Sequence, residues 1–411
     1  TATPSAKGAE NAARAARELM GDWVQLTVND GGVLLGRASA QERDEARYRG
    51  GVDGPKAPPS ATLNPRLISD GVECVRLAEA VAERAGRKAA TCGDLTRIAA
   101  RPGSGFTALD GVVVPFGAME SRLRECGRWP AYQNAIAAVD AATRAGSPPD
   151  IERACDGVRD VITDAGCSLE LAATICAGFF ESRLGTGLLA VRASANVDDP
   201  AQMSGCGGHV SVVGVQADSC AAVAEAIAQV WASLFTPEAV RIRAAAGVGA
   251  SADAHMAVVV QEMAPAAVSF VLHTGGRIES VKSLNPGALP DPRLEVELAV
   301  GLGEALARSG SGSRGDPWRV EVDLATGDAT TTAFGGIGMA RVYQPHLGLR
   351  DEAVDYSKQE LSLDAEARER LCRRLAAVGA ALEAEFGGPQ NVEGCIVGDD
   401  VYVFQSRPQP L

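Results

Sequence analysis

Residues 391–408 read NVEGCIVGDDVYVFQSRP and carry more information about the fold and the site than any other segment. Two apolar runs flank Gly398-Asp399-Asp400, a pattern that predicts an antiparallel β-hairpin. If those three residues form the turn, three cross-strand pairs follow: Val397 with Val401, Glu393 with Gln405, and Asn391 with Arg407. A two-residue turn would shift the register and leave Glu393 and Gln405 on opposite faces. Both registers are open at this stage.

The first register would place four polar side chains on one face of an otherwise apolar hairpin. Burying such groups without partners would cost several kcal/mol. A carboxylate beside an amide oxygen suits a hard cation such as Mg²⁺, so Glu393 and Gln405 are candidate metal ligands. A neighbouring arginine, Arg407, suits a phosphate. In this register the hairpin predicts a site for a metal ion and a phosphate.

Sheet-forming segments also precede the hairpin. Strands are expected at 256–263, 268–274, 294–301 and 318–324. One helix interrupts them, because apolar residues recur at spacings of three and four before Gly387-Gly388. Its stripe consists of Leu371, Leu375, Val378, Leu382 and Phe386. These patterns predict a sheet-rich lobe over residues 248–411.

Helical patterns dominate the preceding part of the chain. Helices are expected from a helical apolar period at 70–87, over most of 119–183 with breaks at Pro130 and 146–149, and over 218–247. Buried strands are expected near 110–114 and at 188–195. We therefore predict an α+β fold with a helical lobe over 67–247. Residues 22–37 predict a short β-hairpin within a β-rich element over 1–40, and the charged, Gly/Pro-rich stretch 41–66 predicts a linker.

Composition narrows the classes of partner. The 411 residues are 46% hydrophobic and carry 39 Lys and Arg against 52 Asp and Glu, a formal net charge of −13. An acidic surface repels phosphate backbones and anionic lipid, so we expect no nucleic-acid and no membrane partner, and a soluble protein. The longest uncharged apolar run, 171–180, is about half of a membrane span. Ten cysteines without a C-x-x-C pair indicate buried thiols in a reducing compartment.

Three further patterns are candidate binding elements. Arg192 ends the apolar run of LLAVRASA, and a glycine-rich turn follows that could close over phosphates, with Gly205, Gly207 and Gly208. The exit of the 256–263 strand, Gln261-Glu262-Met263, could seat an adenine, and GLGE with Glu304 could be a phosphate loop. Core strands and plain loops show the same patterns, so both interpretations stay open. The first residues lack the apolar core of a signal peptide.

Several segments together resemble the C-terminal region of phosphoglucan, water dikinases: LAVRASANVDDPAQMSGCGG, VWASLFTPEAV, VVVQEMAPAAVSFVLHT, VGLGEALA, DYSKQELSLD and PQNVEGCIVGDDVYVFQSRPQPL. The resemblance covers roughly residues 110–411. More distantly, V-R-A-S-A, Q-E-M and V-E-G…Q-S-R resemble the nucleotide-binding domain of pyruvate phosphate dikinase and phosphoenolpyruvate synthase. The resemblance implies an ATP-grasp-like domain that holds ATP between two lobes.

The resemblance also implies a reaction, in which ATP, phosphoglucan and water give AMP, orthophosphate and a further phosphorylated glucan. The β-phosphate passes first to a histidine on a swivelling domain. Residues 18–37 resemble only the tail of that domain, so the phosphohistidine domain is an expected partner, and a chloroplast location is implied. Carried onto this sequence, the site roles are Arg192 on the polyphosphate, Gln261, Glu262 and Met263 on adenine, Glu393 and Gln405 on Mg²⁺, and Arg407 on the transferring phosphoryl group.

Two departures from the pyruvate-type dikinases stand out. Asn391 replaces an Asp two residues before the metal-binding Glu. A glycine-flanked Lys of their N-terminal loop falls near Thr91 or Cys92 here, which leaves Lys88 out of register. The alternatives are a dikinase acting on another acceptor, such as unphosphorylated glucan or pyruvate, and an ATP-binding module without catalysis.

Overall fold

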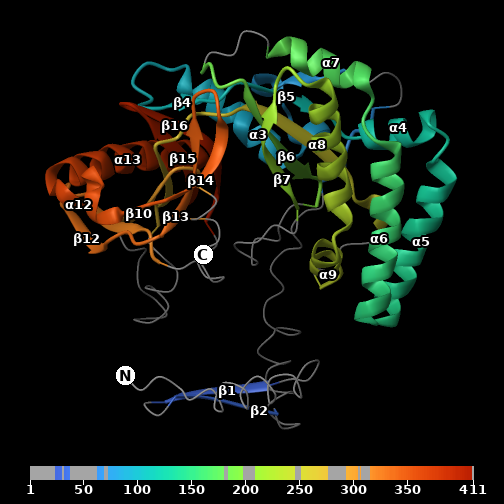
Figure 1. Cartoon of the computed structure of the whole chain (residues 1–411), viewed down its shortest axis with the longest axis horizontal. Coiled ribbons are helices and arrows are strands. Elements are labelled where there is room, and N and C mark those ends of the chain that lie inside the picture. The colour runs from blue at the N-terminus through green and yellow to red at the C-terminus, as the bar shows by residue number, and fades with distance from the viewer. Residues whose placement is uncertain are drawn as a thin grey trace. The chain divides into compact units, whose positions relative to one another are not determined.

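The computed structural model describes residues 24–29, 32–37, 63–68, 73–179, 184–197, 209–245, 251–275, 293–303, 306 and 315–409 (Figure 1). The chain forms two compact units, residues 1–61 and 62–411. In the first unit, β1 (Val24–Asn29) pairs antiparallel with β2 (Gly32–Arg37), which confirms the hairpin expected at 22–37. Most of the predicted linker 41–66 lies outside the described residues.

A five-stranded antiparallel sheet organises the first part of the second unit. Its strands are, in spatial order, β3 (Val75–Arg76), β5 (Gly111–Val114), β8 (Met256–Glu262), β6 (Leu188–Ala195) and β7 (Ser211–Gln216). Every residue of β8 is buried. We expected β8 in the sheet-rich lobe, and that placement is wrong, because β8 bonds to β5 and β6. An apolar run covered on both faces does not reveal which sheet it joins.

Helices cover one face of this sheet and build the largest core cluster. They are α4 (Ala118–Glu125), α5 (Trp129–Ala145), α6 (Pro148–Ala165), α7 (Leu169–Gly178), α8 (Cys220–Ala232) and α9 (Pro237–Ala245), with 3₁₀ turns η2 (Ser233–Phe235) and η3 (Ser251–Asp253). The predicted breaks are confirmed, since Pro130 lies in the first turn of α5 and Gly146 caps it at φ 71°. The helix expected over 218–247 is interrupted before Pro237, which cannot continue a helix.

Among the described helices, no single one has both the length and the apolar character of a membrane span. Two bent pairs reach that length and composition together, Pro148–Ala165 with Leu169–Gly178 and Cys220–Phe235 with Pro237–Ala244.

Helix α3 (Ala82–Ala99) lies on the other face of the five-stranded sheet. It also contacts β16 (Asp400–Pro408), the last strand of the chain, which belongs to a second, seven-stranded sheet. The helix predicted over 70–87 is therefore misplaced, since β3 and the 3₁₀ turn η1 (Leu77–Glu79) precede a start at Ala82. Gly86 interrupts the helical backbone at φ 80°, and a Cβ there would overlap Ser194. The Ser194 hydroxyl bonds both sides of this kink, donating to Ala85 O at 2.6 Å and accepting from Ala89 N at 3.2 Å.

A seven-stranded sheet forms the rest of the unit. Its order is β12 (Ala329–Ala333), β11 (Trp318–Asp323), β10 (Arg293–Val300), β9 (Val268–His273), β15 (Gln390–Val397), β16 (Asp400–Pro408) and β4 (Thr107–Ala108). Helix α13 (Ala365–Phe386) packs across one face of it, preceded by η4 (Tyr356–Lys358) and α12 (Glu360–Leu363). The strand and helix predictions here are confirmed, including the helix end before Gly387, which adopts φ 73°.

A separate two-stranded hairpin, β13 (Met339–Gln344) and β14 (Gly348–Ala353), was not predicted. Its strands, MARVYQ and GLRDEA, show no regular alternation of apolar and polar residues and contain one β-branched residue, Val342, so the strand signal is weak. In Figure 1 the hairpin is drawn in orange, and in this view it lies between the red part of the chain and the five-stranded sheet.

The terminal hairpin combines the two registers that the sequence left open. Its turn has two residues, Gly398 and Asp399, and Val397 faces Asp400, so the three-residue turn is wrong. A register shift beyond Glu393 nevertheless restores the predicted pairs of Glu393 with Gln405 and Asn391 with Arg407. Phe404 is the extra residue of this β-bulge, and a bulge residue has no cross-strand partner.

Candidate functional site

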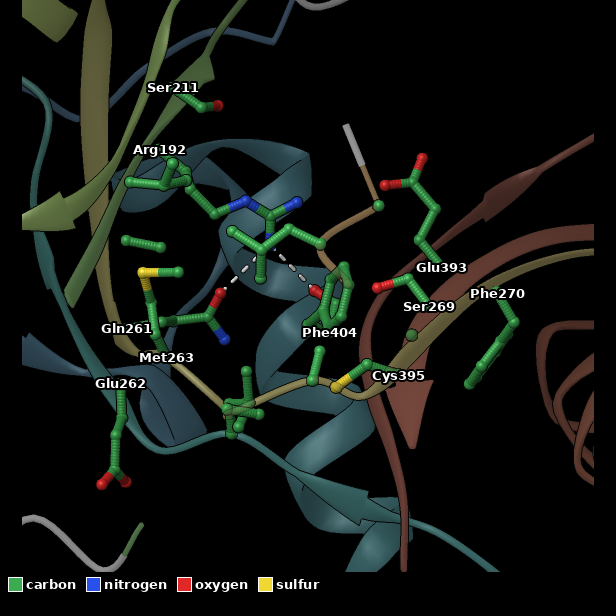
Figure 2. Close-up of a pocket in the computed structure, with 18 of the residues that line it drawn as sticks. Arg192, Ser211, Gln261, Glu262, Met263, Ser269, Phe270, Glu393, Cys395 and Phe404 are labelled. Atoms are coloured by element: carbon green, nitrogen blue, oxygen red, sulfur yellow. Dashed lines mark hydrogen bonds between the residues drawn. The ribbon is translucent and has the colours of Figure 1, made fainter. Parts of the chain in front are cut away.

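An apolar cavity of about 240 Å³ lies between the two sheets. Both sheets and the connections after β8 and β10 line it, as Figure 2 shows for the labelled side chains. Most lining groups are apolar: Leu109, Ala190, Val213, Met263, Ala264, Ala266, Phe270, Val271, Leu302, Cys395 and Phe404. A flat apolar ring system suits such a slot, because small-molecule sites combine apolar walls with a few polar groups.

Arg192 on β6 marks the polar end of this apolar cavity. One terminal nitrogen, Nη1, donates to the side-chain oxygen of Gln261 at 3.1 Å and to the carbonyl oxygen of Phe404 at 3.0 Å. The other, Nη2, donates to Gln405 Oε1 at 2.5 Å. Figure 2 shows the first two bonds as dashed lines. The guanidinium therefore joins the five-stranded sheet to β16.

The β-bulge explains why the Phe404 carbonyl is available. Because Phe404 has no partner on β15, its carbonyl accepts from Arg192 and also from the Cys92 thiol, at 3.4 Å. The Phe404 ring lies 5.8 Å below the guanidinium. Cys92 is buried, and burial raises the pKa of its thiol, so it remains protonated near neutral pH. At this end of the apolar cavity, the Arg192 guanidinium is therefore held by uncharged hydrogen-bond acceptors.

A smaller pocket of about 50 Å³ shares Arg192 with the apolar cavity. Its lining is polar and cationic and includes Lys88, Cys92, His209, Ser211 and Gln405. Lys88, which the sequence leaves out of register with the family's lysine, therefore lines the same pocket as Arg192, because α3 carries it there. The signal in the sequence was Gly86, two residues earlier, where the helix is interrupted and a new helical segment starts. Two cations on one pocket suit a polyphosphate.

Glu393 and Gln405 lie together as predicted. Gln405 Nε2 donates to Glu393 Oε1 at 3.0 Å, while Gln405 Oε1 accepts from Arg192. Within the described residues no group of three or more His, Cys, Asp and Glu is arranged to hold a metal. One carboxylate beside one amide fits Mg²⁺ only where phosphate oxygens and water complete its coordination, which is the usual arrangement for this ion.

Arg407 is placed less centrally than predicted. It faces Asn391 on β15 but lines neither of the two pockets. Asn391 is buried, and its amide nitrogen lies 3.3 Å from His273 Nδ1. Its amide oxygen has no hydrogen-bond partner among the described residues. The edge of the site beyond Gln405 therefore holds an arginine, and beside it a buried amide oxygen that accepts no hydrogen bond from the described residues.

The predicted adenine seat has fewer available backbone donors than the sequence suggests. The side chains of Gln261, Glu262 and Met263 line the apolar cavity, but two of their backbone donors are engaged in the sheet. Glu262 N donates to Asp110 O at 3.2 Å and Met263 N to Leu188 O at 2.9 Å. Glu262 also accepts from Leu184 N at 2.7 Å, so its carboxylate caps a neighbouring turn. Ala264, missed by the sequence analysis, lines the cavity next to them.

Four predicted residues lie outside the described ones: Gly205, Gly207, Gly208 and Glu304. The buried thiols are confirmed in part. Cys92, Cys155, Cys167, Cys372 and Cys395 are buried and free, whereas Cys126 is exposed. Burial raises the pKa of the Cys372 and Cys395 thiols to about 12.

Comparison with known proteins matches the chain to a family. The family model described as "Pyruvate phosphate dikinase, AMP/ATP-binding domain" matches residues 82–411. Rifampicin phosphotransferase of Streptomyces sviceus is 29% identical over 340 residues, which is 79% of this chain and 34% of that protein. A probable phosphoenolpyruvate synthase of Methanothermobacter thermautotrophicus is 26% identical over 329 residues, 79% of this chain and 43% of that protein.

A third relative is alpha-glucan water dikinase 2 of Arabidopsis thaliana, 27% identical over 180 residues, 38% of this chain and 13% of that protein. The chain thus spans less than half the length of each of these relatives. The match to the family begins at the start of α3, so Lys88 and the kink at Gly86 lie inside the matched region.

Proposed function

The chain belongs to the family of pyruvate phosphate dikinase AMP/ATP-binding domains, and from this we propose that it is the ATP-binding part of a phosphoglucan, water dikinase. The apolar cavity takes the adenine, and the pocket of Lys88 and Arg192 takes the polyphosphate. The β-phosphate of ATP passes to a histidine of a separate swivelling domain and then to a glucosyl hydroxyl of phosphorylated starch. AMP and orthophosphate are released.

The observation that carries the nucleotide assignment is the place of Arg192. Its guanidinium lines both the apolar cavity and the cationic pocket, and it bonds Gln405, which bonds Glu393. The proposed sites for the base, the polyphosphate and the metal ion thus all adjoin the side chain of Arg192. Phosphoryl transfer requires mainly positioning and charge neutralisation, and this arrangement provides both.

The residues of this chain have separate tasks in the proposed reaction. Arg192 and Lys88 bind and orient the phosphates, and the carboxylate of Glu393 with the amide of Gln405 would hold Mg²⁺. A metal ion held there would neutralise charge on the phosphate oxygens. Arg407, at the edge of the site, would contact the transferring phosphoryl group. Closely packed apolar side chains of the cavity exclude water from the base.

Glucan as acceptor is supported by the wording of the motifs at 189–208 and 389–411 and by the glucan water dikinases among the relatives. A chloroplast location is part of the same proposal; the alpha-glucan water dikinase of Solanum tuberosum is described as chloroplastic. Rifampicin phosphotransferase and phosphoenolpyruvate synthase are also among the relatives. The acceptors of those two enzymes are therefore the competing assignments for the acceptor of this chain. A module that binds ATP without transfer is a further alternative, which Asn391 and the small metal-ligand set favour.

The test uses the chain as it stands. Calorimetry should show binding of Mg·ATP, weakened when Mg²⁺ is removed. The chain alone should not phosphorylate glucan. With a separately supplied phosphohistidine domain and ATP labelled at the β-phosphate, label should reach the histidine. Phosphorylated glucan, unphosphorylated glucan, pyruvate and rifampicin are then offered in parallel. Transfer to a different acceptor corrects the substrate, binding without any label on the histidine favours the non-catalytic module, and absence of ATP binding refutes the proposal.

A further inference from the structure

We propose that the β13–β14 hairpin clamps the base-binding end of the apolar cavity and that Leu349 is its positioning residue. The inference rests on the proposed function, because it assumes that this cavity takes the base of a nucleotide. The hairpin belongs to neither of the two larger sheets. An isolated two-stranded hairpin is only marginally stable in water, so what it contacts determines where it lies.

The first contact joins Leu349 of β14 to Gly214 of β7. Gly214 is the irregular residue of β7, lying at φ 78° where the register with β6 shifts. A Cβ at this position would lie 2.7 Å from Leu349 Cδ1, closer than real Cβ atoms approach any neighbour. The missing side chain therefore leaves a notch that the Leu349 side chain occupies. A single contact thus connects the hairpin to the five-stranded sheet.

Gly214 also contacts a residue that lines the cavity. Its backbone N–H donates to the Met263 sulfur at 3.0 Å, and Met263 lines the cavity together with Val213. Leu349 thus contacts Gly214, which connects two residues of the cavity wall, Val213 on β7 and Met263 after β8. Methionine is flexible and adopts many rotamers, so a bond to its sulfur restricts where the side chain lies.

The second contact is made by the backbone of β13. Leu302 N donates to the Arg341 carbonyl at 2.8 Å, and Leu302 also lines the cavity. The preceding residue is again a glycine, Gly301 at φ 75°, where a Cβ would overlap the Arg341 carbonyl oxygen. These two contacts therefore fall at or beside glycines, where the missing Cβ leaves room for the Leu349 side chain at Gly214 and for the Arg341 carbonyl at Gly301.

The hairpin consequently holds three segments of the cavity wall, β7, the exit of β8 and the exit of β10. A flat ring is bound well only when the walls of its slot keep their spacing, since preorganisation reduces the cost of binding. The polyphosphate instead contacts Arg192 and Lys88, and Arg192 is held by Gln261, Phe404 and Gln405. Loosening the hairpin should therefore weaken binding of the base and spare binding of the phosphates.

The experiment compares two leucines of the same hairpin. Leu349→Ala empties the notch, whereas Leu347→Ala changes a side chain that is 57% exposed and serves as the matched control. Calorimetry measures the affinity of each protein for Mg·ATP and for Mg·tripolyphosphate, which has no base. We expect Leu349→Ala to weaken ATP binding about tenfold and to leave tripolyphosphate binding within about twofold. Leu347→Ala should leave both affinities unchanged.

Unchanged ATP affinity in Leu349→Ala, or an equal loss for ATP and tripolyphosphate, would overturn the inference while the proposed function stands. A wild-type chain that binds no ATP would overturn both. If Leu349→Ala fails to fold, hydrogen exchange of the wild-type protein decides. Exchange of the Gly214 and Leu302 amides and of 339–353 should slow more with ATP than with tripolyphosphate. Equal protection by the two ligands would refute the clamp.

Discussion

Replacing Glu393 by Gln should abolish most of the phosphoryl transfer while leaving the fold and most of the ATP affinity intact. A glutamine has the same shape, and its Oε1 can still accept the bond that Gln405 Nε2 donates at 3.0 Å. In the proposed function the base lies against Gln261 to Ala264, whereas Glu393, which also lines the apolar cavity, is assigned to the metal ion. The change therefore removes one negative charge and little else.

The size of the effect follows from that charge. Two unit charges 4 Å apart interact by about 4 kcal/mol at an effective dielectric constant near 20. Because Glu393 is partly exposed, we reduce this to about 2.7 kcal/mol, which corresponds to about 100-fold in rate. ATP affinity should fall by less than about tenfold, since the base and the two cations Arg192 and Lys88 still bind.

The assay follows label from the β-phosphate of ATP to a supplied phosphohistidine domain, alongside calorimetry of Mg·ATP and thermal unfolding. Glu385→Gln is the matched control, because it removes a carboxylate from an exposed ion pair with Arg101 far from both pockets. The control should transfer phosphate at the wild-type rate. Full transfer activity in Glu393→Gln would refute both the assignment of the metal ligand and the role carried over from the family.

Three further outcomes are expected. Arg192→Lys keeps the charge, but its single ammonium nitrogen cannot span the acceptors that Nη1 and Nη2 reach separately, so calorimetry should show ATP affinity about tenfold or more lower, and wild-type affinity would contradict the central place of this guanidinium. Val401→Ala should lower the free energy of unfolding by about 1–2 kcal/mol without changing ATP affinity, because Val401 is 1% exposed; a loss of affinity at unchanged stability would speak against this. Burial raises the pKa of the Cys372 and Cys395 thiols from 9.0 to about 12, so stability should be full below pH 9 and decline as pH rises toward 12. A melting temperature that stays constant across that range would contradict the burial of these thiols.

Val401 illustrates how a small irregularity changes an assignment. From a three-residue turn, Val401 was expected on the same face as Glu393 and Arg407. In the structure it belongs to the core beneath α13, together with Val392, Ile396 and Val403. The bulge at Phe404 reverses which side chains of β16 point to each face of the sheet, before and after the bulge. The length of the turn therefore does not determine which residues pair at the site.

Local patterns were sufficient for most elements that the structure contains. The apolar spacing of α13, its end before Gly387 and the strand at 188–195 all follow from residues close in the chain. Periodicity reports which face of an element is buried, and glycine and proline report where it ends. The residue types that suit a metal ion and a phosphate were recognisable for the same reason.

Only the tertiary structure decided which elements share a sheet and which side chains share a pocket. The strand β8 joins β5 and β6 rather than the later strands, and Lys88 lines the same pocket as Arg192. The notch at Gly214 has meaning only because Leu349, more than a hundred residues later, occupies it. Such choices depend on non-local hydrogen bonds and on the fit of distant side chains. A buried strand or an isolated glycine has the same local sequence whichever partner the fold brings to it.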